Sequence, residues 1–356
     1  MGKTNLPCTR KKPIYELLIS GFQRLERSLL RRSKIWRFTK QGPSPKAKSE
    51  QRVTEDIAFD KRFDLAAGRV DEAAPGVRRI VADNPGPFTF KGTVSYIVGR
   101  GRVAIIDPGP DDARHIAALL DAVRGETVTH IFVTHTHRDH SPAVPAIKAA
   151  TGAEVLAEGP HRPARPLHIG EAPRLEASND LDFRPDRRLA DGDVVSGDGW
   201  TMEAITTPGH TANHMAFAFR EADVLFSGDH VMAWSTSIVA PPDGAMSDYM
   251  TSLAKLARRT EGTYFPGHGG AVRDAPRFVQ SYIRHREGRE ASILHRLGKG
   301  PADIPTLVRA IYIGIDPRLV GAAGLSVLAH LEDLVVRGAV ATEGPPSISG
   351  TYRLPL

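Results

Sequence analysis

Residues 134–140 read Thr-His-Thr-His-Arg-Asp-His, which places His135, His137, Asp139 and His140 within six positions of one another. Three imidazoles and a carboxylate in so short a stretch are costly to place unless they share a cation, and both groups are common metal ligands. The apolar run at 131–133 that precedes them is typical of a buried strand. Open α/β layers bind ligands beyond the carboxyl ends of their strands. The stretch therefore predicts a metal site on a turn after a strand.

Three later stretches repeat the order of a short apolar run, a glycine and a side chain that can bind a metal. Their glycine–ligand pairs are Gly209-His210, Gly228-Asp229 and Gly267-His268. With the first cluster they give seven candidate ligands, all of which offer nitrogen or oxygen, while the single cysteine, Cys8, is far away in the sequence. Imidazole with carboxylate suits zinc, iron, manganese or cobalt, and the absence of thiolate leaves the choice among them open.

These motifs resemble those of the metallo-β-lactamase superfamily, across residues 77–345. The resemblance implies an α/β fold, a four-layered αββα sandwich, with two metal ions in its cleft. It implies that His135, His137 and His210 hold one ion, that Asp139, His140 and His268 hold the second, and that Asp229 bridges the two. Asp107 matches an early strand-end aspartate of the family, which would accept a hydrogen bond from a ligand histidine. Asp107-Pro-Gly is also simply a favourable turn.

The implied chemistry is hydrolysis. Two divalent ions about 3.5–4 Å apart would share a hydroxide, because the ions lower the pKa of bound water. Asp139, as ligand and hydrogen-bond acceptor, is placed to orient this nucleophile. His214 is the candidate proton donor to the leaving group, and support of a ligand is the alternative role. We expect zinc as the metal, with iron or manganese as alternatives.

The composition is that of a globular protein with more than one domain. The chain has 356 residues, of which 41% are hydrophobic and 25% are charged. One cysteine allows no intramolecular disulfide, so we expect a cytoplasmic protein. A hairpin at 95–106 and helices at 111–123, 142–151, 247–259 and 275–297 are predicted for the catalytic domain, which we place at 53–297.

The basic character of the chain is confined to its start. Residues 1–52 contain 14 Lys and Arg against three acidic residues, a balance of +11, whereas the rest of the chain has a balance of −5. Apolar residues recur there at helical spacing, at Ile14, Leu18, Phe22, Leu25 and Leu29. Such an arm can contact a membrane surface or nucleic acid. Packing on the protein's own body and a poorly ordered arm are the other readings.

A small second domain is predicted at 298–356. Helical runs at 303–313 and 322–337 precede two short strands around Gly344-Pro-Pro, which would form a small β-wing. This tail resembles the winged helix of the β-lactamase-like endoribonuclease subgroup, and the segments 84–93 and 248–253 also resemble that subgroup. Its arginines are matched by acidic residues, so the sequence predicts no strong phosphate-binding patch.

The substrate is left open between two classes. The subgroup resemblance favours single-stranded RNA and hence an endonuclease. The alternative is a small ester or thioester, as for the hydroxyacylglutathione hydrolases, which are similar in the same seven ligands. Trp234 and Tyr249 could stack a base or line an apolar pocket. A non-enzymatic protein with a structural metal is the third hypothesis, and oligomer formation stays open.

Overall fold

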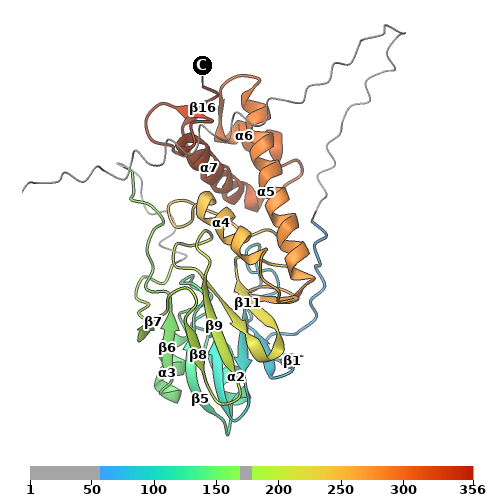
Figure 1. Ribbon diagram of the computed structural model, residues 1–356, viewed down its shortest axis with the longest axis vertical. Coiled ribbons are helices and arrows are strands. Elements are labelled where there is room, and N and C mark those ends of the chain that lie inside the picture. Colours follow the sequence, from blue (N-terminus) through green and yellow to red (C-terminus); the bar gives the residue numbers. More distant parts are fainter. Residues whose placement is uncertain (1–56, 169–178, 356) are drawn as a thin grey trace, which may run out of the picture. The chain divides into compact units, whose positions relative to one another are not determined.

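Two β-sheets face each other in the computed structural model of the protein, which describes residues 57–168 and 179–355 (Figure 1). The described residues belong to one compact unit. The basic arm and linker expected at 1–52 lie outside the described residues.

The first sheet has seven strands in sequence order. They are β1 (Val70–Ala74), β2 (Val77–Val81), β3 (Val94–Val98), β4 (Arg102–Ile106), β5 (Thr127–Phe132), β6 (Glu154–Ala157) and β7 (Arg187–Arg188). Strands β1 to β4 pair antiparallel, and β4 to β7 pair parallel. The hairpin predicted at 95–106 is confirmed by β3 and β4.

The second sheet has six strands in the order β13-β12-β11-β10-β9-β8. They are β8 (Val194–Ser196), β9 (Thr201–Thr206), β10 (Met215–Phe219), β11 (Val224–Gly228), β12 (Thr263–Pro266) and β13 (Val272–Arg273), with the short 3-10 helix η2 (Arg220–Ala222) between β10 and β11. Only β11 and β12 pair parallel in this sheet. Their carboxyl ends therefore meet at one edge.

The main core lies between the two sheets, because alternate residues of a strand point to opposite faces. Phe132 of β5 and Phe217 of β10 meet there with ring centroids 5.0 Å apart. Trp200 packs in the same core, and its indole nitrogen donates a hydrogen bond to the carbonyl of Arg102. On the other face of the first sheet, neighbouring residues such as Ile131 enter a separate core.

Helices cover the outer face of each sheet and complete the αββα order. The helices α2 (Ala113–Ala122) and α3 (Val144–Thr151) pack on the first sheet, and α4 (Met246–Leu256) and α5 (Ala275–Leu297) pack on the second. Asp112 caps α2 by accepting a hydrogen bond from the amide of His115. The predicted fold class and all four predicted helices of this domain are confirmed, α5 with its predicted bounds.

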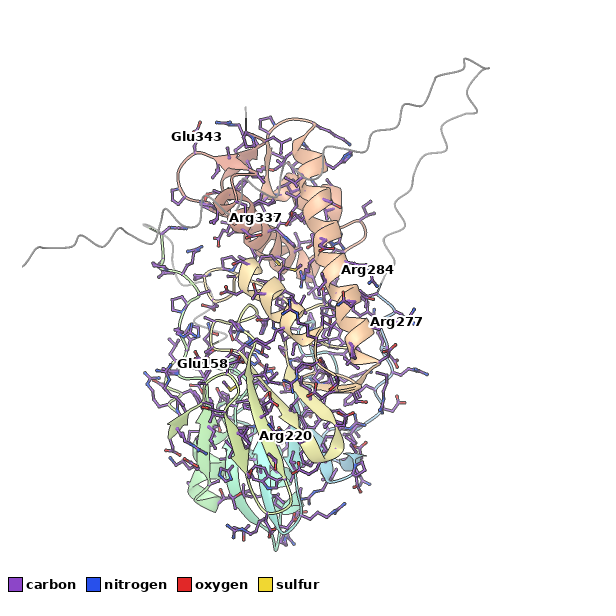
Figure 2. The ribbon with its side chains drawn as sticks, in the orientation of Figure 1. Glu158, Arg220, Arg277, Arg284, Arg337 and Glu343 are labelled. Atoms are coloured by element: carbon purple, nitrogen blue, oxygen red, sulfur yellow. The ribbon has the colours of Figure 1, made fainter. Side chains whose placement is uncertain are left out.

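The winged helix follows α5 without a linker. It consists of β14 (Ala302–Asp303), α6 (Ile304–Ile311), the 3-10 helix η3 (Pro317–Leu319), α7 (Val320–Val336), β15 (Ala341–Thr342) and β16 (Thr351–Arg353). The sequence predicted both helices and the last two strands but missed β14, whose two residues pair with β16. The last turns of α5 supply Ile293 and Leu297 to this domain's core, so packing is continuous across residue 297. Arg337, labelled in Figure 2, bonds Glu290 of α5 and Asp333 of α7.

Helix α7 is a core helix, although Pro317–Val336 has the length and apolar composition of a membrane span. Half of that window is buried inside the fold, and Leu328, Leu331 and Leu334 belong to the winged-helix core.

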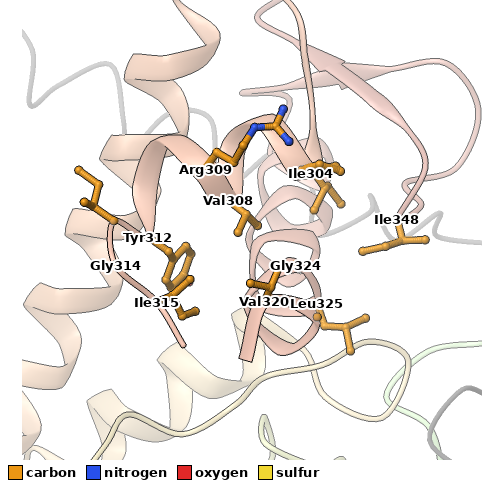
Figure 3. Close-up of a pocket in the computed structure, with 13 residues that line it drawn as sticks. Ile304, Val308, Arg309, Tyr312, Gly314, Ile315, Val320, Gly324, Leu325 and Ile348 are labelled. Atoms are coloured by element: carbon orange, nitrogen blue, oxygen red, sulfur yellow. The ribbon is translucent and has the colours of Figure 1, made fainter. Parts of the chain in front are cut away.

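An apolar pocket of about 650 Å³ opens between α6 and α7, with Val308, Tyr312 and Gly324 in its wall (Figure 3).

His330 of α7 makes the stability of the fold depend on pH. The side chain is only 2% exposed, and burial together with the nearby Arg286 lowers its pKa to about 3. In the unfolded chain the same group takes up a proton near pH 6.5, so stability falls as the pH drops from 6.5 towards 3. This histidine contributes about 1.4 kcal/mol per pH unit in that range.

In His330→Leu we expect the free energy of unfolding to fall less steeply with decreasing pH between pH 6.5 and 5. The slope should decrease by the contribution of one proton, about 1.4 kcal/mol per pH unit, since leucine removes the titrating group and keeps the site apolar. Urea unfolding of both proteins at pH 7, 6 and 5 measures this slope. Parallel slopes in the two proteins would contradict the assignment.

Candidate metal centre

The seven predicted ligands come together at the edge where strands β5, β9, β11 and β12 end. They form two groups, His135, His137, His210 and Asp229 in the first and Asp139, His140 and His268 in the second. Within each group the ligand atoms lie within 4.8 Å of one another. These are the two sets that the family resemblance implied.

Three imidazole nitrogens converge in the first group. His137 Nδ1 lies 3.0 Å from His135 Nε2 and 3.1 Å from His210 Nε2. Burial and the neighbouring histidines lower the pKa of His137 to about 3 and that of His135 well below its usual value. Both rings are therefore neutral near pH 7, which is the form that binds a metal.

Asp229 touches both groups, as a bridging ligand must. Its Oδ2 lies 3.7 Å from His210 Nε2 and 3.3 Å from His268 Nε2, and its Oδ1 lies 3.6 Å from His140 Nε2. Asp139 Oδ2 completes the second group at 3.3 Å from the Nε2 atoms of His140 and His268. The position of Asp229 thus agrees with the implied bridge.

The electrostatics of the second group also fit a cation. Burial alone would lower the pKa of His268, but the Asp229 and Asp139 carboxylates raise it to about 9. Among the described residues, the buried atoms His140 Nε2 and Asp229 Oδ1 have no hydrogen-bond partner. Metal ions between these atoms would neutralise the carboxylates in place of protons, so the residues present fit a dinuclear site built from nitrogen and oxygen donors.

Hydrogen bonds on the outer side of the rings turn the ligand nitrogens inwards. His140 Nδ1 donates to Asp107 Oδ2 at 2.9 Å, in the role expected of Asp107. His210 Nδ1 donates to the carbonyl of Ile238 at 2.6 Å. A ring that donates from one nitrogen presents the lone pair of the other to a metal.

Asp107 is itself held in place by the turn that carries the first ligands. Its two oxygens accept from the amide and the hydroxyl of Thr134, both at 2.7 Å. The Thr134 hydroxyl in turn lies 3.0 Å from His135 Nδ1. Asp107 adopts a φ of 47°, a conformation that few non-glycine residues take, and these bonds offset its cost.

Glycine is required beside the bridging carboxylate because the backbone comes close to the ligands. A Cβ at Gly267 would stand 2.5 Å from Asp229 Oδ1 and 2.6 Å from the ring of His140. At Gly228 it would stand 2.6 Å from His214 Nε2, and φ there is 48°. The glycine that precedes each later ligand in the sequence therefore has a steric cause at these two positions.

Segment 84–93 reaches the metal centre through Thr93, a contact that the sequence did not reveal. The Thr93 hydroxyl donates to Asp139 Oδ2 at 2.8 Å. Asn84 holds Thr93 from both sides, since its amide donates to that hydroxyl at 3.0 Å and its oxygen accepts from the Thr93 amide at 2.9 Å. The resemblance implies that this segment flanks the metal cleft, but no local pattern around Thr93 indicates that Asp139 is its partner.

A second unexpected contribution comes from the segment before β7. Asn179 forms a bridge with the backbone of His137, and its side-chain amide donates to Asp243 at 2.6 Å. His161 lies on the other oxygen of Asp243 at 3.6 Å. Asn179 and Asp243 are 64 residues apart, so no pattern in the sequence could pair them.

The contacts of His214 fit the alternative role that the sequence left open, which is support of a ligand. Its Nε2 accepts a hydrogen bond from the amide of Asp229 at 3.2 Å, and its Nδ1 lies 2.8 Å from the hydroxyl of Thr207. Burial and the neighbouring His230 hold its pKa well below the usual value. Because Nε2 accepts, the neutral ring carries its proton on Nδ1, towards Thr207, and it supports the backbone of the bridging carboxylate. Its role as proton donor stays a prediction. Tyr249 is likewise fully buried and cannot stack a substrate base.

Comparison with known families agrees with this geometry. The profile described as Metallo-beta-lactamase superfamily matches residues 88–268, and that of the Beta-lactamase associated winged helix domain matches residues 304–345. The chain belongs to the metallo-β-lactamase superfamily, whose members are generally metal-dependent hydrolases.

Individual relatives carry different names. The chain is 31% identical to a beta-lactamase-like protein 2 homolog of Drosophila melanogaster, over 76% of this chain and 91% of that protein. It is also 31% identical to an atrochrysone carboxyl ACP thioesterase of Paecilomyces divaricatus, over 65% of this chain and 67% of that one. A beta-lactamase domain protein from Burkholderia ambifaria has the same fold, with a TM-score of 0.69, 20% identity, and coverage of 85% of this chain and 99% of that one.

We expect the purified protein to bind two transition-metal ions per chain, and Asp229→Ala to lose metal affinity and hydrolysis together, because one carboxylate serves both groups. Elemental analysis and turnover measured on the same samples test this. Full metal content in the variant, or activity in a metal-free sample, would refute the bridging role.

His214→Ala should weaken metal binding and turnover in parallel, by about 10–100-fold, because the amide of Asp229 loses its acceptor. Metal titration and initial rates at saturating metal separate the two effects. A slower rate with unchanged metal affinity would instead restore the proton-donor hypothesis.

Proposed function

We propose that the protein hydrolyses thioesters of apolar or aromatic acyl groups. The observation that carries this proposal is an aromatic pair beside the metal ligand His268. The ring of Phe90 stacks on Trp234 with centroids 4.8 Å apart and an interplanar angle of 10°. Both rings lie against Gly269, where a Cβ would stand 2.9 Å from Trp234 Cδ1 and 3.4 Å from Phe90 Cδ1.

The aromatic pair is held where it can meet a substrate. Phe90 adopts a φ of 56° in a tight turn closed by two backbone hydrogen bonds with Gly86. Both rings stay partly exposed, and Phe88 of the same turn is 50% exposed. An acyl group beside His268 would bury apolar surface against these rings, which stabilises binding by about 25 cal/mol for each Å².

The charges near the ligands favour a substrate with a neutral acyl group over the phosphodiester backbone of RNA. A cavity of about 330 Å³ beside the His210 turn is lined by Glu158 and Asp248 as well as Arg162. Arg162 is paired with Glu158, and Arg165 with Glu332. RNA binding depends on basic side chains that neutralise phosphates, and these two arginines are already engaged with carboxylates.

In thioester hydrolysis, different residues of the chain would have different roles. Two divalent ions, zinc in our proposal, would be held by the seven ligands and supply Lewis acidity at the carbonyl and a lowered pKa for water. Asp139, fixed by Thr93, presents a carboxylate that orients the nucleophile. The Phe90–Trp234 pair binds the acyl group and excludes water from one side of the cleft.

The printed name of the Paecilomyces relative, a thioesterase, supports the same chemistry. Cleavage of single-stranded RNA, favoured by the sequence, stays a prediction. The winged helix and the basic residues of 1–52 are its support, and both candidates need the same ligands.

A parallel assay decides between the two substrates. We expect metal-dependent release of free thiol from a benzoyl thioester and a long-chain acyl thioester, faster than cleavage of a single-stranded RNA oligonucleotide. Trp234→Ala should lower kcat/KM for the aromatic thioester about 10-fold, because one stacking partner and its apolar surface are lost.

An acetyl thioester is the control, since its acyl group is too small to cover the pair and its turnover should change little. Trp234→Phe should keep most of the activity. Efficient RNA cleavage with inert thioesters would reject the thioesterase and promote the nuclease, and an equal loss for acetyl and benzoyl substrates would reject the acyl-binding role of the pair.

A further inference from the structure

The loop between the bridging ligand Asp229 and helix α4 is held from behind by helix α5. Tyr282 of α5 accepts a hydrogen bond from the amide of Met232 at 3.1 Å, and its hydroxyl lies 2.6 Å from the carbonyl oxygens of Met232 and Ser235. One turn further along α5, the Arg286 guanidinium donates to the carbonyl of Ser237. Two side chains of one helix face thus fix the path of residues 232–237.

The end of this loop orients a metal ligand. The carbonyl of Ile238 is the acceptor for His210 Nδ1, and the hydroxyl of Ser237 lies 3.3 Å from the same nitrogen. His210 Nε2, on the opposite side of the ring, is one of the three nitrogens that converge in the first group. A shift of the peptide between Ser237 and Ile238 would therefore displace the adjoining Ile238 carbonyl and rotate this ring in its site.

Arg286 is an unusual residue for this position. It is only 3% exposed, its guanidinium carbon lies 5.0 Å above the ring centre of Tyr249, and the structure records no carboxylate paired with it among the described residues. Burying a guanidinium without a carboxylate is costly. The carbonyl of Ser237 and the face of Tyr249 offset part of that cost. The guanidinium group therefore stays bonded to the Ser237 carbonyl, which fixes this end of the loop.

We propose that Arg286 is a positioning residue of the metal centre, which acts through Ser237 and Ile238 to hold His210 in its ligating orientation. The proposal rests on the metal centre described above and not on the identity of the substrate. It gives α5 a function beyond covering the second sheet.

The same helix ties this support to the winged helix. Arg289 donates to the carbonyl of Ile311 at the end of α6, and its guanidinium carbon lies 4.5 Å from the ring centre of Tyr312. Arg286 faces the metal-site loop and Arg289 faces the winged helix, only three residues apart on α5. Arg289 thus joins α5 to the winged helix and makes no contact with the metal-site loop.

Arg286→Met tests the proposal, because methionine keeps an apolar stem of similar reach and removes every donor. After chelation and gel filtration, the protein is titrated with zinc and with cobalt against a chromophoric chelator. We expect the affinity for one of the two ions to fall about 10–100-fold, the range typical of lost partners of a ligand. The ion of Asp139, His140 and His268 should stay bound, and the visible spectrum of the cobalt protein should change.

Arg289→Met is the matched control, since it removes the same side chain from the same helix without touching the loop. It should keep both ions with wild-type affinity. Arg286→Lys should recover part of the lost affinity, because an ammonium group can donate to the Ser237 carbonyl. Urea unfolding of the metal-free variants shows whether a loss of metal merely follows a loss of fold.

Selective loss of one ion in Arg286→Met, with rescue by lysine and none of it in Arg289→Met, supports the proposal. Unchanged affinity for both ions, or the same selective loss in Arg289→Met, overturns it. Selective loss in a protein that turns over no thioester leaves the role of Arg286 standing and removes only the proposed substrate. A wild-type protein that binds no metal overturns both.

Discussion

Asp229 is the point on which the arrangement of this protein depends. A buried carboxylate has to be neutralised, and the oxygens of Asp229 lie within 4.0 Å of nitrogens from four histidines on three different turns. Those turns follow β5, β9 and β12, so the ends of two facing sheets must meet at this carboxylate. A cation shared between the two ligand groups would satisfy these lone pairs together. The close approach of Gly267 and the strained Asp107 are consequences of that convergence.

Around the centre, hydrogen bonds decide which atom of each ring faces inwards. Asp107 serves His140 from the first sheet, Ile238 serves His210 from the loop after β11, and Thr93 serves Asp139 from the segment before β3. Each support belongs to a different part of the chain. The orientation of the ligands therefore depends on contacts from the first sheet, from the loop after β11 and from the segment before β3.

The ligands and the substrate pocket impose separate demands. Carbonyl and phosphodiester hydrolysis can use the same pair of ions, so the ligands define a hydrolase and leave the electrophile open. In the proposed function the electrophile is selected by surfaces that need no metal. These are the Phe90–Trp234 pair on one side and the paired charges of Glu158 and Arg162 on another. Such surfaces can change while the ligands stay the same, and relatives that carry the names of thioesterases and of lactamase-like proteins are consistent with this.

The sequence by itself indicated the candidate ligands and most helices in short local patterns, and the family resemblance that these patterns carry supplied the αββα order and the winged helix. A histidine-rich turn, a glycine before a ligand and the spacing of α5 need no knowledge of distant residues. Tertiary structure alone decided that Thr93 bonds Asp139 across 46 positions and Arg286 bonds Ser237 across 49. It also decided that His214 accepts a hydrogen bond from the amide of Asp229. The physical reason is that a hydrogen bond depends on where two groups meet in space, and local patterns specify the elements but not the meeting of their side chains.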